Sequence, residues 1–359
     1  MMKRRNLGVL LTAVLTVFVF ATIAIGMIDI TGGGRKSAVV INTWIAQSRG
    51  AGNADRGALV AQKTKIAKLS KAKQTAKQPA KKASKETMDP QKALASLANI
   101  DKEKMNHYKT INGVLSEQKA LYEAQAKEKN DTASAEQNFG KSIENAKASL
   151  KELRRLTDEQ IKIYKATTND AQAIKTAEAT YSTWASAVSA LSVKPLEDSK
   201  LSDLDKKVHE NANSAVVTAE EEMKTVSPAD VSAEDKAILK DEVIADGGSI
   251  QNDMQSGMQE LATVFNEIIK VIQSATSGKS GGALGGLGGA LGLGGGSAPS
   301  VPFDANVLNV LQTFFNLIAQ QMVAFNDSFG GFMQSAGTLA GVSVEKAPAL
   351  TMPTFNVNL

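Results

Sequence analysis

Few residues of this chain carry side chains that catalyse reactions or bind metals. Among its 359 residues there are two histidines, His107 and His209, and no cysteine. Neither histidine has a second histidine or an acid at the spacing of the H-E-x-x-H zinc motif, so each is expected on a helix surface. The missing cysteine excludes disulfides, thiolate catalysis and iron–sulfur clusters.

Motifs of nucleotide-binding and hydrolytic enzymes are also missing from the sequence. It contains no G-x-S-x-G nucleophile elbow, no Walker A loop and no G-x-G-x-x-G turn between a strand and a helix. The run Glu220-Glu221-Glu222 could gather cations, but a solvated helix face is the favoured interpretation. The sequence therefore predicts a protein that is not an enzyme and binds no metal or cofactor.

The charges that remain are distributed unevenly and divide the chain into parts. Residues 1–87 carry 16 Lys and Arg against 3 Asp and Glu, residues 88–276 carry 23 against 31, and residues 277–359 carry 2 against 3. Aromatic residues make up only 5% of the chain, and good helix formers dominate its middle. The predicted fold is all-α, in five parts: a membrane anchor (1–34), a basic stem (35–87), a long-helix bundle or coiled coil (88–276), a Gly-rich linker (277–300) and an apolar C-terminal helix with a tail (301–359).

The anchor is the longest apolar run of the sequence. Leu7–Ile28 contains 22 consecutive uncharged residues, which form a helix of roughly 33 Å at the standard rise and can cross a bilayer. This length favours an uncleaved anchor over a signal peptide cleaved near Ala24-Ile25-Gly26. Flanking basic residues nearly balance, and a body outside the cytoplasm, periplasmic or extracellular, is the expected orientation. The lipid-facing positions are Leu7, Leu11, Val14, Phe18, Ile23 and Ile28.

The stem is predicted to be flexible. Residues 35–62 suggest a short amphipathic helix near the membrane, then a joint at Gly50, Gly52 and Gly57. Trp44 either sits among lipid headgroups or packs on the body. Nine lysines without an acid among them favour a disordered or marginally helical segment that is a solvated spacer or contacts anionic lipid or a cell-wall polymer, with nucleic acid disfavoured. They are Lys63, Lys65, Lys68, Lys71, Lys73, Lys77, Lys81, Lys82 and Lys85.

The body shows the strongest helical periodicity. A face with Tyr108, Leu115 and Tyr122 follows a helix start near Asp89-Pro90, and a heptad seam from 139 to 188 predicts one helix over about 134–192. Further helices are expected after Pro195 and after a capping box at Ser232, with an interruption at Gly247-Gly248. Seam residues assigned to self-association or a partner are Phe139, Ile143, Leu150, Leu153, Tyr164 and Ile174.

The C-terminal helix is apolar over more than half of its circumference. Asp304 is its expected N-cap, and no Lys or Arg occurs from Val301 to Val344. Such a helix must bury most of its surface against a partner, a second copy, a membrane interface or its own bundle. The residues assigned to this contact are Leu311, Phe314, Phe315, Ile318 and Met322.

These parts predict a membrane-anchored structural or interaction protein: a scaffold, tether or assembly subunit. Its expected partners are the lipid membrane and either a second copy of the chain or another protein. Two other classes remain open. One is a sensor-like extracytoplasmic receptor domain, which shares the plan of an anchor followed by a long-helix bundle. The other is a secreted α-helical protein that inserts into membranes and forms pores.

Overall fold

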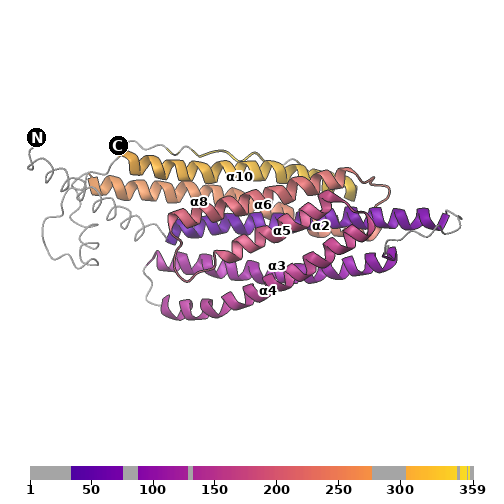
Figure 1. Cartoon of the computed structure of the whole chain (residues 1–359). Coiled ribbons are helices and arrows are strands. Elements are labelled where there is room, and N and C mark those ends of the chain that lie inside the picture. The colour runs from indigo at the N-terminus through magenta and orange to yellow at the C-terminus, as the bar shows by residue number, and fades with distance from the viewer. Residues whose placement is uncertain are drawn as a thin grey trace, which may run out of the picture.

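The computed structural model describes residues 34–75, 88–127, 132–276, 305–345, 348–353 and 355. Within these ranges every regular element is a helix, which confirms the all-α prediction and the helical bundle (Figure 1). The predicted anchor Leu7–Ile28 and the linker 277–300 lie outside the described residues. Among the helices that are described, none is long and apolar enough to cross a membrane.

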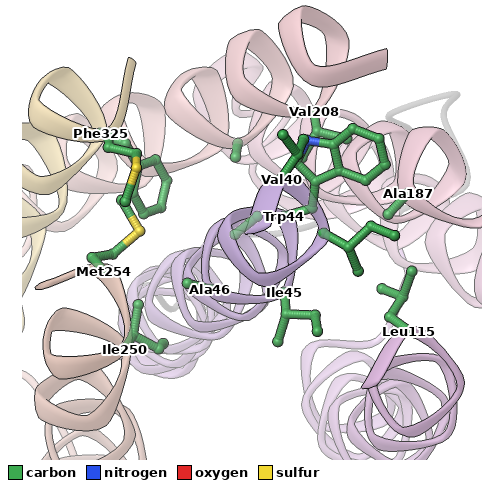
Figure 2. Close-up of a cluster of buried hydrophobic side chains, with 14 of the residues drawn as sticks. Val40, Trp44, Ile45, Ala46, Leu115, Ala187, Val208, Ile250, Met254 and Phe325 are labelled. Carbon is green, nitrogen blue, oxygen red and sulfur yellow. The ribbon is translucent and has the colours of Figure 1, made fainter. Parts of the chain in front are cut away.

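Helix α2 (Gly34–Thr75) is the axis of the bundle. It contacts α3 (Pro90–Gln125), α5 (Ala171–Ser189), α6 (Asp198–Lys224) and α8 (Ala245–Thr276). Figure 2 shows side chains of α2, among them Trp44, in the middle of a ring of apolar residues from the surrounding helices. Trp44 therefore packs on the body. The prediction of a separate basic stem is wrong for residues 35–75, which form the centre of the fold.

The glycines of α2 allow close helix packing. The helix continues without a break through Gly50 and Gly57, so the predicted flexible joint is wrong. A Cβ atom at Gly50 would lie 2.6 Å from Phe325, and one at Gly57 would lie 2.8 Å from Phe332. Both phenylalanines belong to α10 (Ala305–Ala340), so small residues on α2 let the apolar C-terminal helix approach the axis.

The predicted long helix over 134–192 is two helices. Helix α4 (Thr132–Thr167) ends where Asn169 adopts a left-handed backbone with φ 49°, and Asp170 caps α5 by accepting a hydrogen bond from the Gln172 amide at 3.0 Å. Asn tolerates this backbone region, and Asp is a favoured N-cap. The chain therefore turns back, and α5 packs between α2 and α6 instead of extending the seam.

The next helices follow the sequence more closely. Helix α6 buries its predicted face, and Ser232 caps α7 (Ala233–Ile238) by accepting a hydrogen bond from the Asp235 amide at 3.1 Å, as predicted. A π-helical turn, η2 (Leu239–Ile244), joins α7 to α8. The predicted interruption at Gly247-Gly248 is wrong, because α8 passes through both glycines.

Helix α10 docks on its own bundle, against α6, η2 and α8. The chain then returns beside α10 (Figure 1), and Phe355 packs on Phe265 and Phe315 with ring centroids 4.9 and 5.8 Å apart. The Phe355 carbonyl accepts a hydrogen bond from Gln312 at 2.7 Å. The Asp304 cap lies outside the described residues.

Candidate functional site

The basic side chains of α2 are neutralised by acids from the helices around it. Their partners lie far along the chain and come from the loops and helices between residues 101 and 267. The pairs are Arg35 with Glu267, Lys36 with Asp198, Arg49 with Asp246 and Asp253, Arg56 with Asp101 and Glu242, Lys63 with Asp235, Lys65 with Asp170 and Glu222, and Lys68 with Asp230. The uneven charge of the sequence is thus balanced inside the bundle.

The lysines assigned to an anionic surface are divided by the structure. Lys63 and Lys65 are mostly buried and bind carboxylates of the bundle, and Lys68 is exposed but paired. Lys71 is exposed on the last turns of α2, which also include Lys73. The remaining four, Lys77, Lys81, Lys82 and Lys85, lie outside the described residues. The sequence left disorder and a marginal helix open for this segment, and over residues 63–75 the structure has a helix.

The apolar residues assigned to self-association lie in the protein's own core. Phe139, Leu153 and Tyr164 are buried on α4, while Ile143, Leu150 and Ile174 pack at the core edge. On α10 the buried residues are Leu311, Phe315, Ile318 and Met322, and Phe314 is partly buried. Leu317 and Val310 are the large apolar side chains that α10 leaves exposed among its described residues.

Two polar residues expected at the surface are instead packed inside. The Glu222 side chain is 1% exposed and accepts hydrogen bonds from Lys65 and Gln62 at 2.7 and 2.5 Å. His209 is partly buried, with Nδ1 3.3 Å from the Gln47 amide nitrogen, and burial lowers the pKa of its imidazole. Both residues therefore serve helix packing.

A buried polar cluster crosses the bundle beside the middle of α2. Asp55 of α2 and Lys104 of α3 form an ion pair at 2.9 Å, and both side chains are almost fully buried. Gln160 donates to the second Asp55 oxygen at 3.1 Å, and the Tyr108 hydroxyl donates to the first at 3.4 Å. Because every strong acceptor of Asp55 has a donor, the cluster is closed and satisfied.

A cavity of about 250 Å³ lies next to this cluster. One face of α2 and one face of α3 form its long walls, and η2, α5 and the start of α8 complete them. Its lining residues are Arg49, Gly52, Asn53, Arg56, Met105, Tyr108, Lys109, Asn112, Trp184, Glu242 and Asp246. The cavity thus combines aromatic and apolar surface with amides and charges, and it is more polar than most small-molecule sites.

The inner wall of the cavity carries an indole that lacks a partner. Trp184 is 1% exposed, and its ring stacks on Tyr108 with centroids 5.0 Å apart. Its Nε1–H has no hydrogen-bond partner among the described residues, and neither has the Asn112 side-chain oxygen. A buried donor without an acceptor costs about 1–3 kcal/mol, so a ligand acceptor that reaches it gains that energy back.

The π-helical turn places acids at the opposite wall. Glu242 of η2 and Asp246 at the start of α8 both line the cavity, and they bind Arg56 and Arg49. Asn53 donates to the Val243 carbonyl at 3.3 Å and to Asp246 at 3.2 Å, which fixes the turn against α2. Single π-helical turns inside α-helices occur frequently at functional sites.

Electrostatics at this site are set by burial. Desolvation raises the pKa of the Asp101 carboxyl in spite of its ion pair with Arg56. Burial also raises the pKa of Tyr108 well above its ordinary value, and the nearby carboxylate of Asp55 adds to the shift. Tyr108 therefore stays a neutral hydrogen-bond donor at any physiological pH, and its ring remains an uncharged wall of the cavity.

Other chemistry finds little support in the part of the chain that the structure describes. No group of three or more His, Asp or Glu side chains there is placed to hold a metal ion. Comparison with protein-family models, with curated proteins and with solved structures finds no match for this chain. The site must therefore be interpreted from its own geometry.

Sequence reasoning missed this cavity entirely. Arg49, Gly52, Asn53 and Arg56 follow the i, i+3, i+4, i+7 spacing of one helix face, and Met105, Tyr108, Lys109 and Asn112 repeat that spacing on α3. The matching spacing on the two segments was the available signal in the sequence. It was missed because residues 35–62 were predicted to form a short helix near the membrane and a joint.

Proposed function

We propose that this protein is a sensor-like binding module: a helical bundle that takes up a small molecule in the cavity between α2 and α3. The observation that carries the proposal is Trp184, which lines the cavity and whose buried indole N–H has no acceptor among the described residues. In the proposal, the predicted apolar segment Leu7–Ile28 holds the module at a membrane, with the bundle outside the cytoplasm.

Several contacts favour this function over the scaffold predicted first. A scaffold needs exposed apolar seams and unpaired lysines. The bundle instead buries Phe315, Met322 and Leu153 in its core. It also holds Lys63 and Lys65 in ion pairs. The pore-forming alternative needed an apolar C-terminal helix ready to leave the bundle. Helix α10 instead packs on α6, η2, α8, α2 and α7, and it is covered again by the returning chain at Phe355.

A thermal-shift screen of small polar metabolites against the full chain in detergent tests this proposal. A ligand that binds only the folded state at about 100 times its Kd adds about 2.7 kcal/mol of stability, which raises Tm measurably. Asn112→Phe fills the cavity from the partly exposed face of α3, and Gly113→Ala, with open space around its Cβ position, is the matched control.

We expect at least one compound to raise Tm in the parent protein and in Gly113→Ala but not in Asn112→Phe. The proposal is overturned if no compound raises Tm, or if every active compound also raises the Tm of Asn112→Phe. Retained helical circular dichroism in Asn112→Phe shows that the variant is folded.

A further inference from the structure

The groups that line the cavity also select the chemistry of the ligand. We infer that the cavity binds a small monocarboxylate with an apolar body, its carboxylate held between the Trp184 N–H and the Lys109 ammonium group. This inference rests on the proposed function, because it names the ligand class of the same site.

Apart from the Asn112 amide oxygen, the groups left open in the cavity are donors. The Trp184 N–H can only donate, and it has no acceptor among the described residues. Lys109 is exposed on α3 at the cavity, and within the described part of the chain it forms no ion pair. A ligand that offers oxygen lone pairs and a negative charge satisfies both groups.

The acids of the lining are already occupied. Glu242 and Asp246 pair with Arg56 and Arg49, and Asn53 also donates to Asp246. A cationic ligand would have to displace these arginines, while an anion leaves every existing pair intact. The Asn112 amide fits either polarity, because a half-turn of the amide exchanges its oxygen for its NH2 group.

The size and the apolar part of the cavity limit the rest of the ligand. At about 250 Å³ the cavity is smaller than the roughly 300–1,000 Å³ of pockets for drug-sized ligands, so it suits a small molecule. The stacked rings of Tyr108 and Trp184 and the thioether side chain of Met105 supply apolar contact surface. Gly52 lets α2 approach both rings closely, since a Cβ atom there would lie 3.3 Å from the Tyr108 ring and 4.0 Å from the Trp184 Nε1.

The two tryptophans provide a built-in test of this inference. The chain has two indole N–H groups, so a 15N-labelled sample of the full chain gives two indole cross-peaks in an NMR spectrum. Trp44 donates to Asp205 at 2.7 Å and reports on the fold, whereas Trp184 reports on the cavity. Spectra of Trp184→Phe assign the peaks.

Three probes of nearly equal size isolate the charge: 3-methylbutanoate, 3-methylbutanamide and 3-methylbutylamine, titrated into the millimolar range. We expect the carboxylate to move the Trp184 peak downfield and to leave the Trp44 peak in place. The amide should bind about tenfold more weakly, as expected when a hydrogen bond to a charged group becomes a neutral one, and the amine should not bind.

Two variants identify the carboxylate contacts. Lys109→Met keeps the length of the side chain and should weaken 3-methylbutanoate binding about fivefold without changing the binding of the amide. Lys102→Met, seven residues earlier on the same exposed face of α3 and outside the cavity lining, should change neither. Calorimetry on Trp184→Phe, which keeps a ring but lacks the N–H, should show about tenfold weaker binding of the carboxylate.

The outcomes separate this inference from the proposed function. Stronger binding of the amide or the amine at Trp184 overturns the ligand class but leaves the binding module standing. A Trp184 peak that none of the three probes moves also overturns the ligand class, and the metabolite screen then decides on the module. Carboxylate binding that is insensitive to both Lys109→Met and Asn112→Phe places the anion elsewhere and overturns the inference.

Discussion

The two tryptophans of this protein have the same burial but opposite surroundings. Trp44 lies on the axis helix (Figure 2) and is 0% exposed. Its indole N–H is bonded to the buried carboxylate of Asp205. Trp184 is 1% exposed, and its N–H has no acceptor among the described residues. The first tryptophan closes a polar contact between α2 and α6, and the second leaves one open at a cavity. Burial alone therefore does not distinguish a structural tryptophan from one that binds a ligand. The distinguishing feature is whether the indole N–H has an acceptor within the protein.

The largest effect is expected behind the open tryptophan, where Asp55 supports the Tyr108 ring on which Trp184 stacks. Asp55→Ala leaves the Lys104 ammonium group buried without a counter-charge and should lower the free energy of unfolding by about 3–5 kcal/mol, measured by urea denaturation. Removing both charges, with Lys104→Met added, should recover part of this loss. If the variant with both substitutions is no more stable than Asp55→Ala, the unpaired charge of Lys104 is not the cause of the lost stability.

The next largest effect is expected when the hydrogen bond between Trp44 and Asp205 is removed. Trp44→Phe removes the N–H that donates to Asp205, together with some ring volume. It should lower the free energy of unfolding by about 3 kcal/mol at pH 8, since hydrogen bonds to charged groups contribute about 1.5–3 kcal/mol. Urea denaturation measures the change. A loss equal to that of Trp184→Phe would show that the hydrogen bond to Asp205 adds nothing.

The pH dependence of stability tests the contact between Trp44 and Asp205. Burial raises the pKa of Asp205 from 3.8 to about 7, although the hydrogen bond from Trp44 opposes the shift. Because the folded state holds this proton more tightly than the unfolded state, the contribution to stability is complete below about pH 4 and is lost as the pH rises through 7.

Asp205→Asn cannot ionise, so its free energy of unfolding should fall less between pH 4 and pH 8 than that of the parent protein. The expected difference is on the order of 2 kcal/mol, because each pKa unit corresponds to about 1.4 kcal/mol and burial effects are partly relaxed. Urea denaturation at each pH measures the free energy of unfolding of the two proteins. An equal fall in both between pH 4 and pH 8 would refute the assignment of this pH dependence to Asp205.

The smallest effect on stability is expected at the open tryptophan. Trp184→Phe removes an unsatisfied donor, which offsets part of the lost ring packing, so the free energy of unfolding should fall by no more than about 1 kcal/mol. Since Trp44→Phe removes the same volume, the difference between the two variants isolates the hydrogen bond. A cost above that of Trp44→Phe would reverse the comparison.

The helices themselves could largely be predicted from the sequence. The start of α3 at Asp89-Pro90, the buried face of α6 and the Ser232 cap depend on neighbours three or four residues away, which a sequence displays directly. The turn at Asn169-Asp170 was missed because the break contains neither Gly nor Pro, and the heptad pattern continued across it in the sequence alone.

The two helix faces of the site show in the sequence, but their pairing could not be predicted, because the contacts join residues far apart in the chain. Lys63 and Lys65 look unpaired when only their own segment is considered, yet their partners lie more than 100 positions away, at Asp235 and Asp170. The glycines of α2 looked like a joint because the phenylalanines they accommodate come from α10. Which apolar face meets which helix is decided by tertiary packing, and no local pattern encodes it.

The position of α2 has a consequence for biosynthesis. The axis helix leaves the ribosome long before the acids that neutralise it: Asp253 follows Arg49 by 204 residues. At about 5–20 residues per second, a nascent chain waits roughly 10–40 s for this partner. During translation the protein therefore carries a basic helix whose charges are neutralised in steps, from Asp101 early to Asp253 late.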